Sequence, residues 1–193
     1  MDNTRMLQIL EETGALLKGH FLLSSGKHSN RYIQCAKVLR YPWHAEQIIK
    51  VLCKKVKNID INTIIGPAIG GIITSYEMGR QLKIESIFTE RVNGKTVLRR
   101  DFSITKGSNI LISEDVITTG KSTLEVKNLV EEMGAKVLGV ACIVDRRPEG
   151  INLGLTVYSA IKLKIEIYNE KECALCKQGI KLEKPGSRLI SQP

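Results

Sequence analysis

The segment Asn109–Ser122, with the sequence NILISEDVITTGKS, places two carboxylates beside a short loop of small, hydroxylated residues. An apolar run leads into Glu114 and Asp115, and Thr118–Ser122 then opens a helical pattern. Unpaired backbone N–H groups at the start of a helix bind phosphate, helped by the positive end of the helix dipole. Carboxylates accept hydrogen bonds from sugar hydroxyls. The segment therefore predicts a site for a phosphorylated sugar at the carboxyl end of a strand.

The end of this segment, Gly120-Lys121-Ser122, matches only part of the P-loop pattern of nucleoside triphosphatases. That pattern requires another glycine at the position that Asp115 holds here. A carboxylate at this point would repel a triphosphate, so the pattern disfavours such an enzyme. An acidic helix start is the structural alternative, but it accounts for one acid and not for two followed by Thr-Thr-Gly.

Two other segments could also contact anions. The loop GPAIGG, residues 66–71, has glycines that let backbone amides approach a ligand closely. Arg146-Arg147 follows an apolar strand on the ligand side of the predicted sheet, although a solvated basic pair is the simpler interpretation.

The polar segment 92–107 is too long for a simple connection in an α/β unit and carries Lys95, Arg99, Arg100 and Lys106. A mobile basic flap would suit a reaction that releases pyrophosphate, because it neutralises charge on the leaving group. Taken alone, the segment is equally consistent with a solvated hairpin carrying ordinary surface charge.

Strands and helices alternate through most of the chain. We expect helices at residues 5–17, 44–57, 72–82 and 122–133, and strands at 62–65, 84–90, 109–113, 136–145 and 155–163, the last at an edge. Two short strands flank a Ser-Ser-Gly-Lys turn near residue 25. This order predicts an α/β fold with a mostly parallel twisted sheet flanked by helices, with ligands at the carboxyl ends of the strands.

Composition narrows the class of protein. The 193 residues are 42% hydrophobic, which fits one domain, and the apolar runs are too short to span a membrane. The net charge of +9 favours anionic partners, but scattered basic residues and 5% aromatics argue against a nucleic-acid groove. The amino-terminal residues lack a secretory pattern, so we expect a cytoplasmic protein.

The five cysteines include a Cys-x-x-Cys pair, Cys173 and Cys176. A tetrahedral zinc site needs four ligands, and no second pair lies at ligand spacing in the sequence. His20, His28 and His44 are not expected to cluster. The sequence favours two free thiols near a turn, with zinc shared across a dimer as the alternative.

The segment LISEDVITTGKS resembles the phosphoribosyl-pyrophosphate (PRPP) signature of type I phosphoribosyltransferases. In order along the chain, FLLSSGKHSNRYIQ, GPAIGGIITSYEMGRQL and GVACIVDRR resemble orotate phosphoribosyltransferases. The ending CALCKQGIKLEKPGSR resembles the tail of their longer bacterial and archaeal form. The resemblance covers nearly the whole chain. It implies a single domain with a core at about residues 44–150 and a small hood from residues 1–42 plus 151–193.

The resemblance also implies an activity. The family transfers the 5-phosphoribosyl group from PRPP to orotate in the synthesis of UMP, giving orotidine 5'-monophosphate and pyrophosphate. Mg²⁺ arrives with PRPP, and no metal ligand on the protein is expected. A homodimer is implied, in which the mobile loop reaches the neighbouring active site.

Carried over position by position, the resemblance assigns roles to individual residues. Those implied to bind PRPP are Glu114, Asp115, Val116, Ile117, Thr118, Thr119, Gly120, Lys121 and Ser122. Those of the pyrophosphate loop are Pro67, Ala68, Ile69, Gly70 and Gly71. Thr118 and Arg146 would contact orotate, with the turn at residues 25–28 above the base. The groups implied in catalysis are Glu114, Asp115, Arg91, Lys95, Arg99 and Arg100.

The chain departs from the family pattern at three places. Ser24 and Gly70 stand where many members have lysine, and ERVNGKTVLRRDF lacks the usual lysine and histidine spacing of the mobile loop. Two alternatives therefore stay open: a phosphoribosyltransferase for another base, and a PRPP-sensing regulator that binds nucleic acid.

Overall fold

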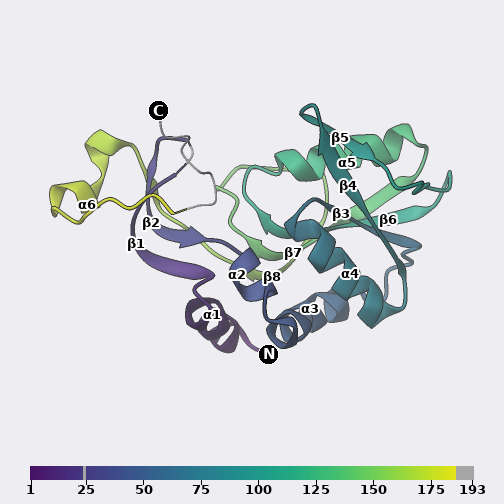
Figure 1. The fold of residues 1–193 in the computed structure, drawn as a ribbon, viewed down its shortest axis with the longest axis horizontal. Helices are drawn as coiled ribbons and strands as arrows, with labels where there is room; N and C mark the ends of the chain where they lie inside the picture. The colour runs from purple at the N-terminus through teal and green to yellow at the C-terminus, as the bar shows by residue number, and fades with distance from the viewer. Residues whose placement is uncertain (24, 186–193) are drawn as a thin grey trace.

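A six-stranded sheet forms the centre of the molecule (Figure 1). The computed structural model describes residues 1–23 and 25–185. The strand order is β5-β4-β3-β6-β7-β8. The strands are β3 (Thr63–Pro67), β4 (Glu85–Val92), β5 (Lys95–Leu98), β6 (Asn109–Ile117), β7 (Lys136–Asp145) and β8 (Val157–Lys162). All pairings are parallel except that of β4 with β5. The prediction of a mostly parallel α/β sheet is confirmed.

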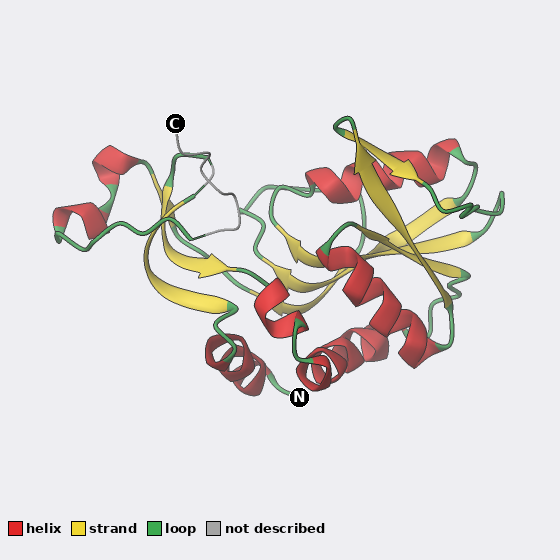
Figure 2. Ribbon diagram, viewed as in Figure 1, coloured by secondary structure: helices red, strands yellow, loops and turns green. Residues whose placement is uncertain are grey.

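Helices cover both faces of this sheet (Figure 2). Apolar side chains alternate along each strand, so the sheet separates two cores. One face packs on α3 (Pro42–Val56) and α4 (Gly70–Leu82), and the other packs on α5 (Lys121–Glu132). No helix within residues 1–23 and 25–185 has the length and apolar character needed to cross a membrane.

A second, three-stranded sheet joins the two ends of the chain. It consists of β1 (Leu16–Leu22), β2 (His28–Ile33) and β9 (Ile167–Tyr168), all antiparallel. Around it lie α1 (Asn3–Glu12), α2 (Ala36–Leu39), a 3₁₀ turn (Glu170–Glu172) and α6 (Ala174–Lys177). We call the three-stranded sheet with α6 and its 3₁₀ turn the hood. The division into core and hood stays a prediction, but β8 pairs with β7 in the main sheet rather than with the hood.

One predicted element is wrong. The helix expected over residues 5–17 ends at Glu12, because Gly14 takes a left-handed backbone with φ +68° and the chain then enters β1. Of the two interpretations of segment 92–107, the structure has the hairpin, because Lys95–Leu98 forms β5 and pairs back on β4. The turn residues Asn93 and Gly94 have φ 49° and 78°, as a tight hairpin requires.

Candidate active site

The residues between β6 and α5 form a loop around a pocket. The pocket measures about 390 Å³ and is lined by Arg91 and by residues 116–122. Gly120 precedes the first residue of α5 with φ 77°, and a Cβ there would lie 2.3 Å from Leu153. Only glycine fits this position, and it turns the first amides of α5 toward the pocket. A helix start beside an arginine is suited to an anion such as phosphate. We call residues 116–122 the phosphate loop.

The two acids lie on opposite sides of β6. The strand does not end at Ser113 as expected but continues to Ile117, with Glu114 opposite Cys142 of β7. Successive side chains of a strand point to opposite faces. Glu114 therefore lies under the phosphate loop, where it accepts hydrogen bonds from the hydroxyls of Ser122 at 2.6 Å and Thr123 at 3.5 Å. The two acids therefore have different surroundings on the two faces of the same strand.

Asp115 lies against the predicted pyrophosphate loop. A Cβ added to Gly70 would fall 2.4 Å from Cγ of Asp115 and 2.5 Å from its Oδ2. Gly70 opens α4, directly after the loop that leaves β3 at Pro67. The glycine thus lets the carboxylate of Asp115 lie against the start of a helix. The loops after β3 and β6 meet at the same edge of the sheet, which is where parallel sheets bind ligands.

The same loop holds its shape through close backbone contact. A Cβ on Gly66 would lie 2.0 Å from the carbonyl oxygen of Gly71, and one on Gly71 would lie 2.7 Å from Pro67. Ile69 projects from the loop with 80% of its surface exposed, and the peptide between Ala68 and Ile69 is cis. The residues of the predicted pyrophosphate loop therefore form one compact turn beside Asp115.

Burial changes the acidity of both carboxyls. It raises the pKa of Glu114 to about 7, with a further contribution from the charge of Asp115, while the Ser122 and Thr123 hydroxyls act to lower it. Burial also raises the pKa of Asp115, offset in part by backbone amides. Glu114 is buried and Asp115 is half-buried at the place where sugar hydroxyls could donate to them.

Replacing Glu114 by glutamine is expected to change how stability depends on pH. Between pH 4.5 and about 7 the unfolded chain has lost this proton and the folded chain keeps it. The unfolded state then binds fewer protons, so wild-type stability falls as pH rises through this window. The Glu114→Gln variant lacks this fall, and its stability relative to wild type should rise by on the order of 3 kcal/mol.

Urea unfolding of both proteins at several pH values measures this difference. The matched control is Glu125→Gln, because the pKa of Glu125 is lowered by Thr96 and Arg91 and its effect has the opposite sign. Parallel pH profiles of wild type and Glu114→Gln would contradict the assignment.

Acidic partners hold most cations of the β4–β5 hairpin. Arg91 and Thr96 both contact Glu125 of α5, with 2.7 Å between the Thr96 hydroxyl and the carboxylate. Arg100 donates to Glu90 at 2.8 Å, and Arg99 lies 3.6 Å from the same carboxylate. Within residues 1–23 and 25–185, Lys95 makes no ion pair. Of the four predicted catalytic cations, only Arg91 lines the phosphate pocket.

Arg146 and Arg147, at the end of β7, have different surroundings. Arg147 donates twice to the buried carboxylate of Asp145, each time at 2.9 Å. The side chain of Arg146 makes no hydrogen bond to any residue that the structure describes. Burial lowers its pKa, and its backbone N–H donates to Ile117 of the phosphate loop at 3.0 Å. Arg146 is therefore the guanidinium that is available to a ligand.

A second pocket, of about 790 Å³, opens between Arg146 and the hood. The turn between β1 and β2 in the hood contributes Ser25 and Lys27 to its wall. Lys162, the last residue of β8, and Lys164 shortly after it also line the pocket. Five of the lining residues are basic, and of these Arg147 and Lys164 are paired with Asp145 and Glu149. The remaining cations, Lys27, Arg146 and Lys162, suit an anionic ligand. Thr118 lines the phosphate pocket instead. Ser24 lies outside the described residues.

Several of these contacts had no signal in local sequence patterns. Ser122 was expected to contact phosphate, but its hydroxyl binds Glu114. Lys162 and Lys164 lie at and just after the end of the expected edge strand 155–163, where no motif singled them out. A strand that continues past residue 113 through Glu114 and Asp115 would place these two side chains on opposite faces, which is the signal that the sequence does carry.

Comparisons with known proteins agree with this arrangement. The phosphoribosyl transferase domain family matches residues 42–169. An orotate phosphoribosyltransferase of Caldanaerobacter subterraneus subsp. tengcongensis is 48% identical over 190 residues, covering 98% of this chain and 100% of the relative. Among solved structures, orotate phosphoribosyltransferase from Aeropyrum pernix has a TM-score of 0.70 at 25% identity, covering 82% of this chain and 93% of that one.

A larger protein shares the same fold. The UMP synthase of Leishmania donovani has a TM-score of 0.72 at 20% identity over 84% of this chain, which spans 37% of that one. The similarity to the bacterial relative runs along essentially the whole length of both chains, and the matched domain includes both anion-binding loops. This chain therefore belongs to the phosphoribosyltransferase family, in its orotate phosphoribosyltransferase branch.

Proposed function

We propose that this protein transfers the 5-phosphoribosyl group of PRPP to orotate, giving orotidine 5'-monophosphate and pyrophosphate in the synthesis of UMP. The observation that carries the proposal is Arg146, a half-buried guanidinium without a hydrogen-bond partner among the described residues. Its backbone is bonded to the phosphate loop, and its side chain lines the basic pocket under the hood. A carboxylated base bound there would pair with Arg146 and lie next to a phosphoribosyl group. The relative that is 48% identical carries the name of this enzyme.

Each part of the site has a proposed task. The amides of residues 118–122 and Arg91 bind the 5-phosphate, and Asp115 binds the ribose hydroxyls beside Gly70. Glu114 supports the loop through Ser122 and becomes available to a hydroxyl if that bond opens. The loop at residues 67–71 binds the leaving pyrophosphate. These contacts hold the anomeric carbon between base and leaving group, so that the displacement needs no protein nucleophile.

The donor set beside Gly70 also fits a magnesium ion that arrives with PRPP. Mg²⁺ prefers oxygen ligands, keeps several waters, and commonly binds through one or two carboxylates and substrate phosphates. Asp115 supplies a carboxylate of this kind next to the proposed pyrophosphate loop. When bound, the ion would neutralise charge on the departing pyrophosphate.

An absorbance assay tests the proposed reaction. Protein, Mg²⁺, PRPP and orotate are mixed, and the loss of orotate absorbance is followed. We expect turnover that depends on all four and that stops when EDTA removes the magnesium. Turnover with adenine in place of orotate would contradict the base assignment and keep the class. Salt-sensitive binding to DNA without any turnover would instead support a regulator.

We also propose that two copies form a homodimer in the cytoplasm through the outer face of α4. Ile69, Ile73 and Tyr76 are 80%, 41% and 68% exposed and share one side of this helix by their spacing. Trp43 at the start of α3, which packs beside α4, is 58% exposed. Exposed apolar side chains gathered in this way are typical of an interface. In the dimer, Lys95 of the hairpin would reach the neighbouring site.

Replacing Tyr76 by glutamate is expected to convert the dimer into a monomer, because it buries a charge in an apolar contact. Light scattering after size-exclusion chromatography measures the mass. Met133→Glu, directly after α5, is the control, since Met133 is 37% exposed and lies away from α4 in the sequence. A wild-type protein that is already monomeric would exclude this interface.

A further inference from the structure

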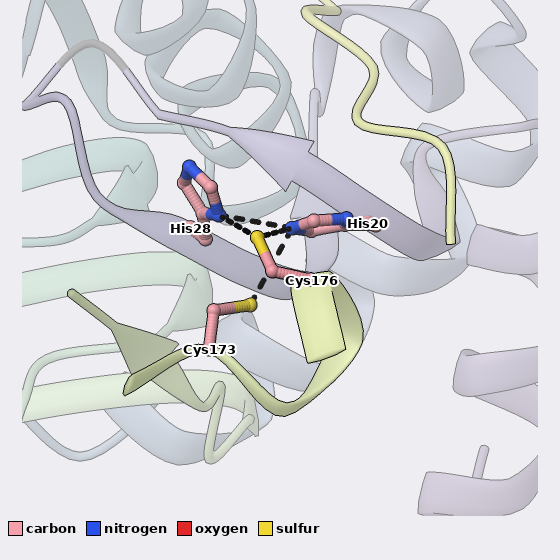
Figure 3. Close-up of side chains that lie close together, drawn as sticks. All are labelled: His20, His28, Cys173 and Cys176. Carbon is pink, nitrogen blue, oxygen red and sulfur yellow. Dashed lines mark hydrogen bonds between the residues drawn. The ribbon is translucent and has the colours of Figure 1, made fainter. Parts of the chain in front are cut away.

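Four potential metal ligands meet in the hood (Figure 3). His20 lies in β1, and His28 is the first residue of β2. Cys173 directly precedes α6, and Cys176 lies within it. Their ligand atoms all lie within 4.8 Å of one another. The prediction that the histidines do not cluster is wrong for His20 and His28. The two histidines lie on paired strands, but the cysteines are some 145 residues further along the chain, so local spacing gave no signal.

The distances within this cluster match a single tetrahedral ion. Zinc–nitrogen bonds of about 2.0–2.1 Å and zinc–sulfur bonds of about 2.3 Å put the ligand atoms about 3.4–3.8 Å apart. Nε2 of His20 lies 3.4 Å from Sγ of Cys173 and 3.7 Å from Sγ of Cys176. Nδ1 of His28 lies 3.2 Å from Sγ of Cys176 and 2.9 Å from Nε2 of His20. All six pairs lie within 4.8 Å, so side-chain shifts of about 1 Å would bring the four atoms to tetrahedral separations.

A backbone contact orients His20 for metal binding. Its Nδ1 lies 2.8 Å from the carbonyl oxygen of Ile180, so Nδ1–H donates and Nε2 presents its lone pair to the cluster. Histidines that bind metals usually make this second contact, which fixes the ring and its tautomer. The same carboxyl-terminal stretch also pairs with β1, because Glu183 bonds to His20 and Leu22 through the backbone.

The carboxyl-terminal segment folds around this cluster without a hydrophobic core of its own. His20, His28 and Cys173 are 2%, 3% and 0% exposed. Among the described residues after Leu163, Cys173 is the only buried one. The segment nevertheless folds into a strand, a 3₁₀ turn and a short helix that end beside β1. Small units without a core are commonly held by a structural metal.

Two sulfur and two nitrogen donors around one point select zinc among the common metals. A two-iron centre with the same ligands would place the histidines and the cysteines on different irons, and its nitrogen–sulfur distances would be longer than those here. All four positions of a tetrahedron are filled by the protein, which is the arrangement of structural rather than catalytic zinc.

We propose that His20, His28, Cys173 and Cys176 bind one Zn²⁺ as a closed structural site that fastens the carboxyl-terminal segment to the hood sheet. Both thiols bind as thiolates, and their protons pass to solvent when zinc enters. His28 directly follows the turn that contributes Ser25 and Lys27 to the basic pocket. The ion therefore also fixes the wall of that pocket without touching a ligand in it.

Metal analysis of the untagged full-length chain, purified without chelators, tests the proposal. We expect one zinc per chain and loss of that zinc in Cys176→Ser. Cys176 is the most exposed of the four ligands, so its replacement least disturbs folding. Cys53→Ser removes a thiol from α3 and should keep the full zinc content. Cobalt exchanged into wild type should give the absorption of tetrahedral cobalt with thiolate ligands, and Cys176→Ser should lack it.

Thiol titration distinguishes the alternatives. Zinc should protect Cys173 and Cys176 from a thiol reagent until a strong chelator is added, and chelation should make residues 165–183 sensitive to protease. A disulfide between Cys173 and Cys176 would overturn the proposal. Two freely reactive thiols in a folded, metal-free protein that takes up no added zinc would overturn it as well.

Discussion

Replacing Asp115 by asparagine is expected to lower kcat/KM for PRPP by about 100-fold, the usual effect of removing one group that acts on the transition state. The amide keeps the shape of the side chain but loses the charge that lies against Gly70 and the start of α4. It binds ribose hydroxyls less strongly and offers a poorer ligand to magnesium. Steady-state kinetics at saturating orotate measure the change.

The Asp115→Asn variant should fold at least as well as wild type. Burial raises the pKa of Asp115, so its charge costs stability that an amide does not. Thermal unfolding gives this comparison. Asp60→Asn is the matched control. Asp60 lies before the amino end of β3, at the end of the sheet opposite the site, so this variant should leave kcat/KM unchanged. Full activity in Asp115→Asn would remove this carboxylate from the site.

Replacing Arg146 by alanine is expected to raise the KM for orotate by about 10- to 100-fold, as the loss of a hydrogen bond to a charged group implies. The structure gives Arg146 no partner among the described residues, so its charge is free to pair with the carboxylate of the base. The KM for PRPP should change little. Initial rates over a range of orotate concentrations measure the effect.

Arg147→Ala, at the neighbouring position, is expected to lower stability rather than raise the KM for orotate. Arg147 and Asp145 form a pair whose side chains are 17% and 4% exposed, and removing one partner strands the other. We expect a loss of about 3 kcal/mol in the free energy of unfolding, with the KM for orotate little changed. Equal rises in KM for orotate in both variants would contradict the distinction between the two arginines.

The main sheet could be predicted because each of its central strands carries its own signal. Runs such as Ile110–Ile112 and Val140–Val144 are apolar on both faces, and helical patterns separate them. Burial on both faces is what the helices α3, α4 and α5 provide. Local composition therefore determined the class of fold, and the ligand edge followed from the direction of the strands.

The hairpin could be anticipated only as one of two interpretations. The pair Asn93-Gly94 is a strong hairpin signal, but the charges around it are equally consistent with a mobile loop. Similarly, the carboxylates of Glu114 and Asp115 suggested that β6 had ended, and both remain in the strand. In each case a charged side chain on a regular strand has a partner nearby. Arg91 and Arg100 donate to Glu125 and Glu90, and Glu114 accepts a hydrogen bond from Ser122.

The cluster in the hood could not be predicted from spacing. Its histidines and cysteines come from opposite ends of the chain, and they meet because β9 pairs with β2. Likewise, the charge of Arg147 is taken up by Asp145 while Arg146 is left without a described partner, and this depends on side-chain geometry that adjacent identical residues do not reveal.

The pairing of β2 with β9 also sets an order of events during synthesis. Its contacts, such as His28 with Tyr168, join residues separated by most of the chain, and such contacts form slowly because a long loop must close first. The strands from β3 to β8 can assemble while the last residues are still being made. A ribosome-bound chain should therefore form the sheet edge that carries the loops after β3 and β6 before β9 completes the hood.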